Sequence, residues 1–239
     1  MAPLGLGTGF YGVGPTLSST DPAAIWTPYN LGSKLVHWYR FNQSGVLQTA
    51  TGIGSWIDSV GSNTLSPTAN NDADEQPALN ADGTVFFEQA TDSLVFDSAL
   101  AVGTFAIYIK HNFLAGQTVG EARLFEGSAD YIELYSPTEV RLNIGAVHKI
   151  TIDEIIEGTP YVFGVERVGA GAITAYKDNL VGSAAGGTSN SVAVSTTVDI
   201  TQVGDPVNES VFYEIIICDA PLTGTPERTN LYNYLNQLQ

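Results

Sequence analysis

Short runs of apolar residues, separated by turn-forming residues, make up the pattern along most of the chain. In the run TFAIYIK at 104–110, Phe105, Ile107 and Ile109 alternate with other residues, which is the period of a half-buried β-strand. Runs of this kind occur at 35–41, 53–57, 84–88, 93–96, 104–110, 122–126, 131–135, 139–144, 147–152, 160–168, 172–177, 192–200 and 211–218. Many short strands divided by turns predict an all-β sandwich or barrel rather than repeated strand–helix–strand units.

A convincing helical pattern stands at the C-terminal end. Thr225 suits the N-cap position, Pro226 suits the first helical position, and Glu227 complements the positive end of the helix dipole. Apolar side chains then follow at the spacing of one helical face: Leu231, Tyr234, Leu235 and Leu238. The sequence therefore predicts one short C-terminal helix.

Residues 1–33 follow neither the strand period nor the helix period. They contain one charged side chain, Asp21, and their first half is rich in glycine and proline. Apolar anchors are spread along them: Phe10, Tyr11, Ile25, Trp26 and Tyr29. We predict an extended, Gly-rich N-terminal arm over 1–33 whose anchors contact a partner, followed by a single β-sandwich domain over 34–239.

The stretch GTGFYG at 7–12 has the glycine spacing of a dinucleotide-binding loop. Such a loop lies between a strand and a helix, because the helix N-terminus receives the pyrophosphate. Pro3 and Gly5 stand where the strand should be, and Pro15 stands where the helix should begin. We therefore interpret these glycines as backbone joints of the arm and predict no nucleotide site.

The charge balance is strongly acidic. The 239 residues include 25 acidic and 9 basic side chains, for a formal net charge of −16, so we expect no direct binding of nucleic acid. No apolar stretch approaches the roughly 20 residues that span a bilayer, and no secretory signal is recognised, so we expect no membrane partner. The single cysteine, Cys218, lies in an apolar run and is expected to be a buried thiol.

Patterns for nucleophilic or metal chemistry are weak. His37, His111 and His148 have no nucleophile at a recognised spacing, and neither G-x-S-x-G nor H-E-x-x-H occurs. The segment NDADE at 71–75 offers oxygen ligands of the kind that calcium prefers, but its spacing is not that of an EF-hand. We predict no metal or other cofactor.

Paired carboxylates for glycoside hydrolysis were sought in the segment EGSADYIE at 126–133. Glucanases place acids in E-x-D-x-x-E on one strand, where alternate side chains share a face. Here Gly127 and Ser128 indicate a turn after Glu126, and Asp130 and Glu133 are three positions apart. We therefore predict that the protein is not an enzyme.

Three stretches resemble the concanavalin A-like, laminin-G-like jelly-roll domains. The resemblance is carried by WIDSVGSN at 56–63 with QPAL at 76–79, VFF at 85–87 and DSLVF at 92–96, by AITAYKDNLVG at 172–182, and by FYEIIICDAPLT at 212–223 with the helix behind it. It covers about residues 34–238 and implies a jelly-roll β-sandwich. Trp56 and Phe87 would then be core residues, and Asp58 and Asp92 would accept backbone N–H groups in turns. The family's calcium and sugar ligands have no residue-by-residue match, so neither activity is implied.

Domains of this group are frequent in tailed-phage virions, and the opening GTGFYG resembles the N-terminus of phage structural proteins. This resemblance implies a non-enzymatic virion protein, either a capsid decoration or cement protein or a tail-associated one. Its partners would be other virion proteins and copies of itself, as a homo-oligomer such as a trimer. The alternative is a lectin-like module, on a phage tail or on a bacterial surface, that binds cell-surface glycans by aromatic stacking on strand tyrosines, of which Tyr108, Tyr131, Tyr135, Tyr161 and Tyr176 are available.

Overall fold

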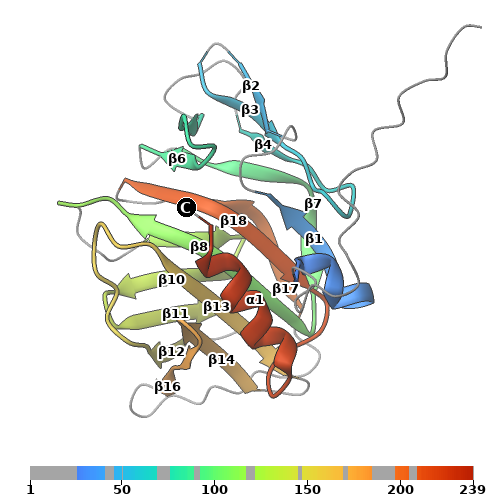
Figure 1. Ribbon diagram of the computed structural model, residues 1–239, viewed down its shortest axis with the longest axis vertical. Coiled ribbons are helices and arrows are strands. Elements are labelled where there is room, and N and C mark those ends of the chain that lie inside the picture. The colour runs from blue at the N-terminus through green and yellow to red at the C-terminus, as the bar shows by residue number, and fades with distance from the viewer. Residues whose placement is uncertain are drawn as a thin grey trace, which may run out of the picture.

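The computed structural model describes residues 26–40, 46–49, 51–68, 76–88, 92–116, 122–144, 147–168, 172–184, 197–204 and 209–238. Within these ranges the chain forms two antiparallel β-sheets that pack face to face (Figure 1). One 3-10 helix and one α-helix accompany them. The all-β sandwich that the alternating runs predicted is confirmed.

The first sheet, named sheet A here, contains eight strands within the described ranges. Its order is β15–β14–β13–β8–β18–β6–β5, and β1 pairs with β18 outside this path. The strands are β1 Leu35–Tyr39, β5 Ala78–Leu79, β6 Val85–Phe87, β8 Phe105–Phe113, β13 Tyr161–Val168, β14 Ala172–Lys177, β15 Leu180–Val181 and β18 Ser210–Cys218. Strands from the middle and the end of the chain, β8 and β18, thus lie side by side at the centre.

The second sheet, sheet B, contains ten strands in the part of the chain that the structure describes. Its order is β16–β12–β11–β10–β9–β17–β7–β4–β3–β2. The strands are β2 Val46–Gln48, β3 Ile53–Trp56, β4 Leu65–Pro67, β7 Leu94–Val102, β9 Ala122–Glu126, β10 Tyr131–Ser136, β11 Glu139–Asn143, β12 Val147–Thr151, β16 Ser183–Ala184 and β17 Val198–Val203. The chain passes repeatedly from one sheet to the other, for example from β6 to β7 to β8.

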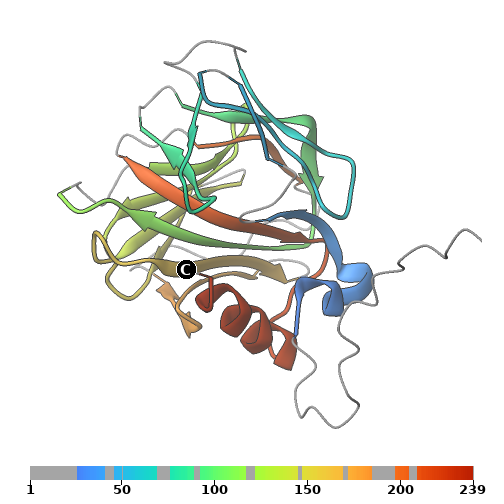
Figure 2. The ribbon, with the colours of Figure 1, turned by 45° about the horizontal axis from the view of Figure 1, so that its top comes forward.

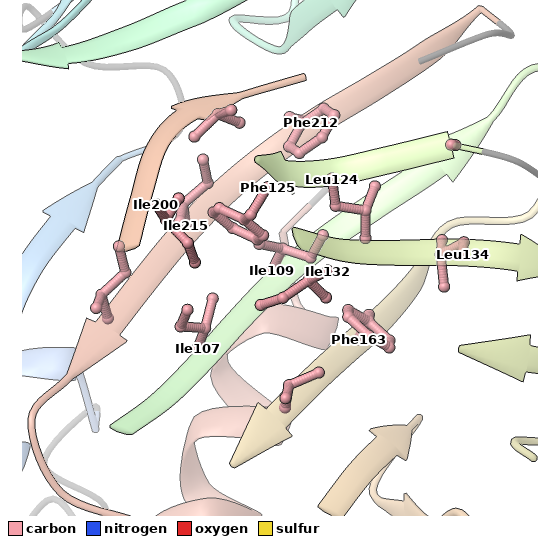
Figure 3. Close-up of a cluster of buried hydrophobic side chains, with 14 of the residues drawn as sticks. Ile107, Ile109, Leu124, Phe125, Ile132, Leu134, Phe163, Ile200, Phe212 and Ile215 are labelled. Carbon is pink, nitrogen blue, oxygen red and sulfur yellow. The ribbon is translucent and has the colours of Figure 1, made fainter. Parts of the chain in front are cut away.

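The main core lies between the two sheets. Figure 3 shows Ile107, Ile109 and Ile215 of sheet A directed towards Phe125 and Ile132 of sheet B. Trp56 and Phe87, predicted as core residues, are both buried in this layer. At about 25 cal/mol per Å² of apolar surface removed from water, this layer is the main favourable contribution to folding.

A second apolar cluster lies on the outer face of sheet A, under the helix α1 (Pro226–Asn236), which Figure 2 shows lying across that face. Ala106 and Tyr108 of β8 face this cluster, so all nine residues of β8 are buried. The prediction of a half-buried strand was wrong for β8, because the alternation marks the side that faces sheet B but does not tell that a helix covers the other side.

A residue close in sequence lies at the start of helix α1, and a residue distant in sequence forms hydrogen bonds at its end. Thr225 takes the N-cap position as predicted, but its hydroxyl donates to the Leu222 carbonyl (2.7 Å) rather than capping the helix. At the other end, the buried Lys110 ammonium of β8 donates to the main-chain carbonyls of Asn236 and Leu238. A cation therefore stands at the negative end of the helix dipole, although no basic residue lies in the last turn of α1.

The last residues of the predicted arm pack on the sandwich. The 3-10 helix η1 (Pro28–Lys34) buries Pro28 and Leu31, and Leu31 joins the cluster under α1. The ring of Trp26 meets the ring of Tyr234 edge-on, with centroids 6.2 Å apart. Residues 26–33 are thus attached to the body of the domain, and residues 1–25 lie outside the described residues.

Gly164 of β13 is required by close packing, which gives a first prediction. A Cβ at this position would stand 2.2 Å from the ring of Tyr108, which is buried under α1. We expect Gly164→Ala to lower the free energy of unfolding by about 1–3 kcal/mol, since the ring must be displaced in a packed layer. Urea denaturation measures this. Gly103→Ala is the control, because its added Cβ meets nothing within 4 Å; equal losses in the two variants would contradict the packing argument.

Candidate functional site

A pocket of about 340 Å³ opens at one end of the sandwich, between β1 of sheet A and β7 of sheet B. Four segments that are distant in sequence form its wall. The lining residues are Val36, His37, Ser62, Asn63, Ser98, Ala99, Leu100, Ala101 and Asp219. The histidine, serine, asparagine and aspartate side chains among them have groups that can hydrogen-bond to a small polar ligand.

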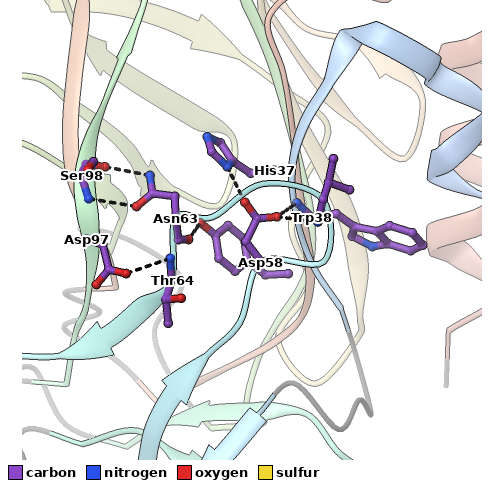
Figure 4. Close-up of polar contacts among 9 residues, drawn as sticks. His37, Trp38, Asp58, Asn63, Thr64, Asp97 and Ser98 are labelled. Atoms are coloured by element: carbon purple, nitrogen blue, oxygen red, sulfur yellow. Dashed lines mark hydrogen bonds and ion pairs between the residues drawn. The ribbon is translucent and has the colours of Figure 1, made fainter.

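The ring of His37 is held in place by the carboxylate of Asp58. His37 Nδ1 lies 2.6 Å from Asp58 Oδ2, and the backbone N–H groups of Trp38 and Val60 each donate to Asp58 Oδ1 at 3.0 Å (Figure 4). The prediction that Asp58 accepts backbone N–H groups in a turn is confirmed. The same holds for Asp92, which accepts the N–H of Glu88 at 2.7 Å.

The hydrogen bonds decide the charge of Asp58. Burial acts to raise the pKa of the Asp58 carboxyl, but the bonds from His37 and from the backbone of Trp38, Val60 and Gly61 outweigh it and hold the pKa below its usual range. Asp58 is therefore an ionised acceptor at neutral pH, and His37 Nδ1 must carry the hydrogen between them. In neutral His37 the other nitrogen, Nε2, is then a hydrogen-bond acceptor, and Figure 4 shows it on the side of the ring away from Asp58.

The wall opposite His37 is fixed by Asn63. Its side-chain amide donates to the Ser98 carbonyl (2.7 Å) and its oxygen accepts the Ser98 N–H (2.9 Å). The Tyr39 hydroxyl donates to the Asn63 carbonyl, and the Asp97 carboxylate accepts the Thr64 N–H at 3.3 Å. These bonds join the loop 58–64 to β1 and β7, so the pocket is a built feature of the fold.

The spacing W-x-D-x-x-G-x-N from Trp56 to Asn63 thus has a structural meaning at this end of the sandwich. Trp56 is core, Asp58 and Asn63 hold the loop, and Gly61 lies so close that a Cβ would stand 2.4 Å from Asp58 Oδ2. What remains free to meet a ligand comes from other positions. These are the Nε2 side of His37, and the exposed residues Ser62, Ser98 and Asp219.

Three exposed apolar side chains lie in or next to the segment 57–60. Tyr29 is 57% exposed, and its hydroxyl donates to the Ser59 carbonyl at 3.3 Å while its ring rests edge-on against Trp38. Ile57 and Val60 are also exposed on this loop. None of these three residues lines the pocket.

The predicted contact residues are only partly placed. Phe10, Tyr11 and Ile25 lie outside the described residues. Trp26 packs against Tyr234 on the domain itself, whereas Tyr29 is largely exposed beside the loop 58–64. A role of these residues in binding a partner stays a prediction.

The strand tyrosines proposed for sugar stacking are mostly unsuited to it. Tyr108, Tyr161 and Tyr176 are each 2% exposed, so the expectation that they are available to a ligand was wrong. Burial under α1 or between the sheets explains this, as it does for β8. Tyr131 and Tyr135 are half-buried on the outer face of sheet B.

Both of the half-buried tyrosines on sheet B lie beneath arginines. The guanidinium of Arg123 stands over the Tyr131 ring at 4.8 Å, and Arg141 stands over the Tyr135 ring. Each arginine is also paired with a carboxylate, that of Glu126 or Glu139. This face is therefore an internally satisfied array of side chains.

The groups examined for catalysis have structural partners. Glu126 pairs with Arg123 and accepts from Gln202 at 3.2 Å, while Asp130 accepts the Asp199 N–H at 2.9 Å. Cys218 is buried under α1, and burial, with nearby acids, raises the pKa of its thiol to about 12. It is a packed thiol, as predicted.

The described ranges contain neither a candidate metal site nor a candidate membrane-spanning helix. No group of three His, Cys, Asp or Glu side chains there is placed to hold a metal ion; the acidic segment 71–75 lies outside those ranges. No helix in the same ranges is long and apolar enough to cross a membrane.

The fold and the pocket define a class: a two-sheet β-sandwich domain with a polar pocket at its end. No protein-family model matches the sequence, and comparison with curated protein sequences gives no match. Among solved structures, the chain is similar to Trypanosoma rangeli sialidase in complex with sialic acid, with a TM-score of 0.58 and 15% identity over 90% of this chain and 34% of the sialidase chain.

Botulinum neurotoxin structures are similar as well. One, described by the dependence of type C neurotoxin cell entry on two ganglioside molecules, has a TM-score of 0.55 and 13% identity over 87% of this chain and 53% of that chain. The binding domain of neurotoxin DC in complex with SialylT has a TM-score of 0.56 and 10% identity over 87% and 52%. The chain therefore spans between 34% and 53% of these proteins, and the likeness establishes the β-sandwich fold.

Sequence reasoning did not find this site. His37 stands at no recognised spacing from a nucleophile, and Ser62, Ser98 and Asp219 belong to no catalytic or metal-binding motif. The only signal was the spacing from Trp56 to Asn63, which marks the loop that holds the pocket but not the groups that face it.

Proposed function

We propose that the chain is a non-enzymatic, lectin-like β-sandwich module that binds a glycan in the pocket beside His37. The observation that carries the proposal is the combination of a pocket of about 340 Å³ with a histidine ring held in one orientation and exposed serine and aspartate side chains around it. Ligand pockets are generally of roughly 300–1,000 Å³, with a few polar groups that fix the ligand. This pocket is at the small end of that range, which suits one or two sugar units.

The ligands named for the similar structures support glycan binding as the kind of function. They are a sialidase in complex with sialic acid and neurotoxin structures described with gangliosides or SialylT. This chain spans 34–53% of these proteins, so their ligands are a guide to the kind of ligand and not to its site. The absence of an activated nucleophile or of a carboxylate pair among the described residues of the pocket is the reason for preferring binding to hydrolysis.

The binding proposal is tested by closing the pocket. Ala99 lines the pocket and is exposed, so Ala99→Trp fills it without disturbing a buried contact. On an array of oligosaccharides we expect the wild-type protein to bind a subset of glycans and the variant to bind them at least tenfold more weakly. Ala81→Trp, at an exposed turn residue that does not line the pocket, is the control and should bind normally.

Two results would contradict it. If the wild-type protein binds no glycan on the array, the chain is not a lectin-like module. If Ala99→Trp binds as well as the control, the glycan site lies elsewhere on the domain.

We also propose, as the sequence predicts, that this module is a component of a phage virion. This proposal rests on the composition of residues 1–33, which carry a single charged side chain. A capsid or tail component would present the pocket outwards and use the segment for assembly. A variant lacking residues 1–25 should then fail to join virions, and its normal incorporation would overturn this setting.

A further inference from the structure

The electrostatic character of the pocket narrows the kind of sugar it accepts. Asp219 places an exposed carboxylate in the lining, and the ionised Asp58 lies directly behind His37. Among the nine lining residues there is no lysine or arginine. The pocket is therefore acidic, in a protein with a net charge of −16.

The basic side chains of Lys34 and Arg40, close in sequence to His37, contact groups outside the pocket. Lys34 is adjacent to Asp219 only through its backbone, where its carbonyl accepts the Asp219 N–H at 3.0 Å. Its ammonium pairs with Glu227 of α1. The guanidinium of Arg40 stacks on the Trp38 ring at 4.4 Å. Neither charge is directed at the pocket.

The polar groups that line the pocket are suited to hydrogen bonds with sugar hydroxyl groups. His37 presents Nε2, Asp219 offers a carboxylate, and Ser62 and Ser98 offer hydroxyl groups that can donate or accept. Sugar hydroxyl groups can hydrogen-bond to all of these. A sialic acid carboxylate needs donors or a cation, and it would lie near the Asp219 carboxylate in a partly desolvated site, where repulsion between like charges is strong.

We infer that the pocket selects glycans that end in a neutral sugar and rejects the same glycans when they are capped by sialic acid. The inference rests on the proposed glycan-binding function and assigns its ligand class. It also separates this chain from the sialidase and the neurotoxin domain of similar fold, whose structures contain sialic acid and SialylT.

The direct test compares two matched glycans by titration calorimetry on the full chain. The probes are an oligosaccharide that ends in galactose and the same oligosaccharide carrying a terminal sialic acid, together with glucose-, mannose- and fucose-terminated glycans. We expect at least one neutral glycan to bind and sialylation to weaken its binding tenfold or more. Equal or tighter binding of the sialylated form overturns the ligand class but leaves glycan binding standing; binding of neither form overturns both.

Two substitutions of His37 separate its ligand-facing nitrogen from its structural one. In His37→Asn the side-chain amide can take the place of Nδ1 and still donate to Asp58, while the group at Nε2 is removed. In His37→Gln the amide reaches the place of Nε2 but loses the bond to Asp58. We expect His37→Asn to fold with near-normal stability and to bind the neutral glycan at least tenfold more weakly. Binding at wild-type strength by a folded His37→Asn would overturn the role of Nε2.

Asp219→Asn tests the charge argument. The side chain is exposed and its backbone N–H bond to Lys34 does not depend on it, so the variant should fold normally. We expect the preference for the neutral glycan over its sialylated form to fall at least threefold. An unchanged preference would show that charge at Asp219 does not set the ligand class.

Discussion

Asp58→Ala is expected to lower the free energy of unfolding by about 3–5 kcal/mol, because it leaves several buried donors without an acceptor. The carboxylate is 6% exposed and accepts from His37 at 2.6 Å and from the backbone N–H groups of Trp38 and Val60 at 3.0 Å. These bonds tie the loop 58–64 to β1. Alanine restores none of them, and water reaches a site of this depth poorly.

The loss is measured by urea denaturation at pH 7. Asp97→Ala is the matched control in the same network, because Asp97 is exposed and its carboxylate accepts a single long bond, from the Thr64 N–H at 3.3 Å. We expect the control to change stability by less than about 1 kcal/mol. A loss below 1 kcal/mol for Asp58→Ala would mean that the loop finds other partners and does not depend on this carboxylate.

The second large effect is a loss of stability in mild acid, caused by His111. This side chain of β8 is fully buried, its Nδ1 lies 2.7 Å from the Tyr161 hydroxyl, and its ring contacts Phe113 and Phe212 edge-on. Burial lowers its pKa from 6.5 to about 3. The folded protein therefore does not bind a proton at His111 at a pH where the unfolded chain does.

The sign of the effect follows from this difference. Above about pH 6.5 neither state is protonated at His111 and the group has no influence on stability. Below it, the unfolded state gains the proton, and the free energy of unfolding falls by about 1.4 kcal/mol per pH unit until the pH reaches the folded pKa. The total loss is about 5 kcal/mol at pH 3, and about 2–3 kcal/mol is already lost at pH 4.5.

His111→Phe isolates this contribution. The variant keeps an aromatic ring among Phe113 and Phe212 but cannot be protonated, although it deprives Tyr161 of its partner. The quantity to compare is the slope of unfolding free energy against pH between 7 and 4.5, since the slope does not depend on the starting stability. We expect the slope to be markedly shallower in the variant; identical slopes would show that His111 does not titrate on unfolding in this range.

Much of the fold could be predicted from local patterns. The alternating runs gave the sheets, and Pro226–Asn236 forms the predicted helix. The stretch 172–182 that carries part of the family resemblance forms a hairpin of β14 with β15, in which Asp178 and Asn179 adopt φ of 48° and 67°. The three-residue strands β2 and β4 were not predicted, whereas β6, of the same length, lies within the predicted run 84–88.

The site could be predicted far less well. Asp58 was expected to accept turn N–H groups, and it does, but the pocket beside it depends on residues from four segments between Val36 and Asp219. Nothing in the run LVHWY distinguishes His37 from a strand histidine of no further role. Its orientation comes from a carboxylate 21 positions away, which backbone pairing of the segment 58–59 with β1 brings near.

The sequence by itself determined which side of each longer strand faces a core, where the C-terminal helix begins, and that the surface is acidic, because periodicity, caps and charge are local properties. The tertiary structure alone decided which outer faces are covered and where polar groups meet. α1 crossing sheet A buried Tyr108 and Tyr176, and the meeting of β1, the loop 58–64, β7 and the turn at Asp219 formed the pocket. Both depend on contacts between distant segments, whose free energy is gained only when the two sheets have packed together.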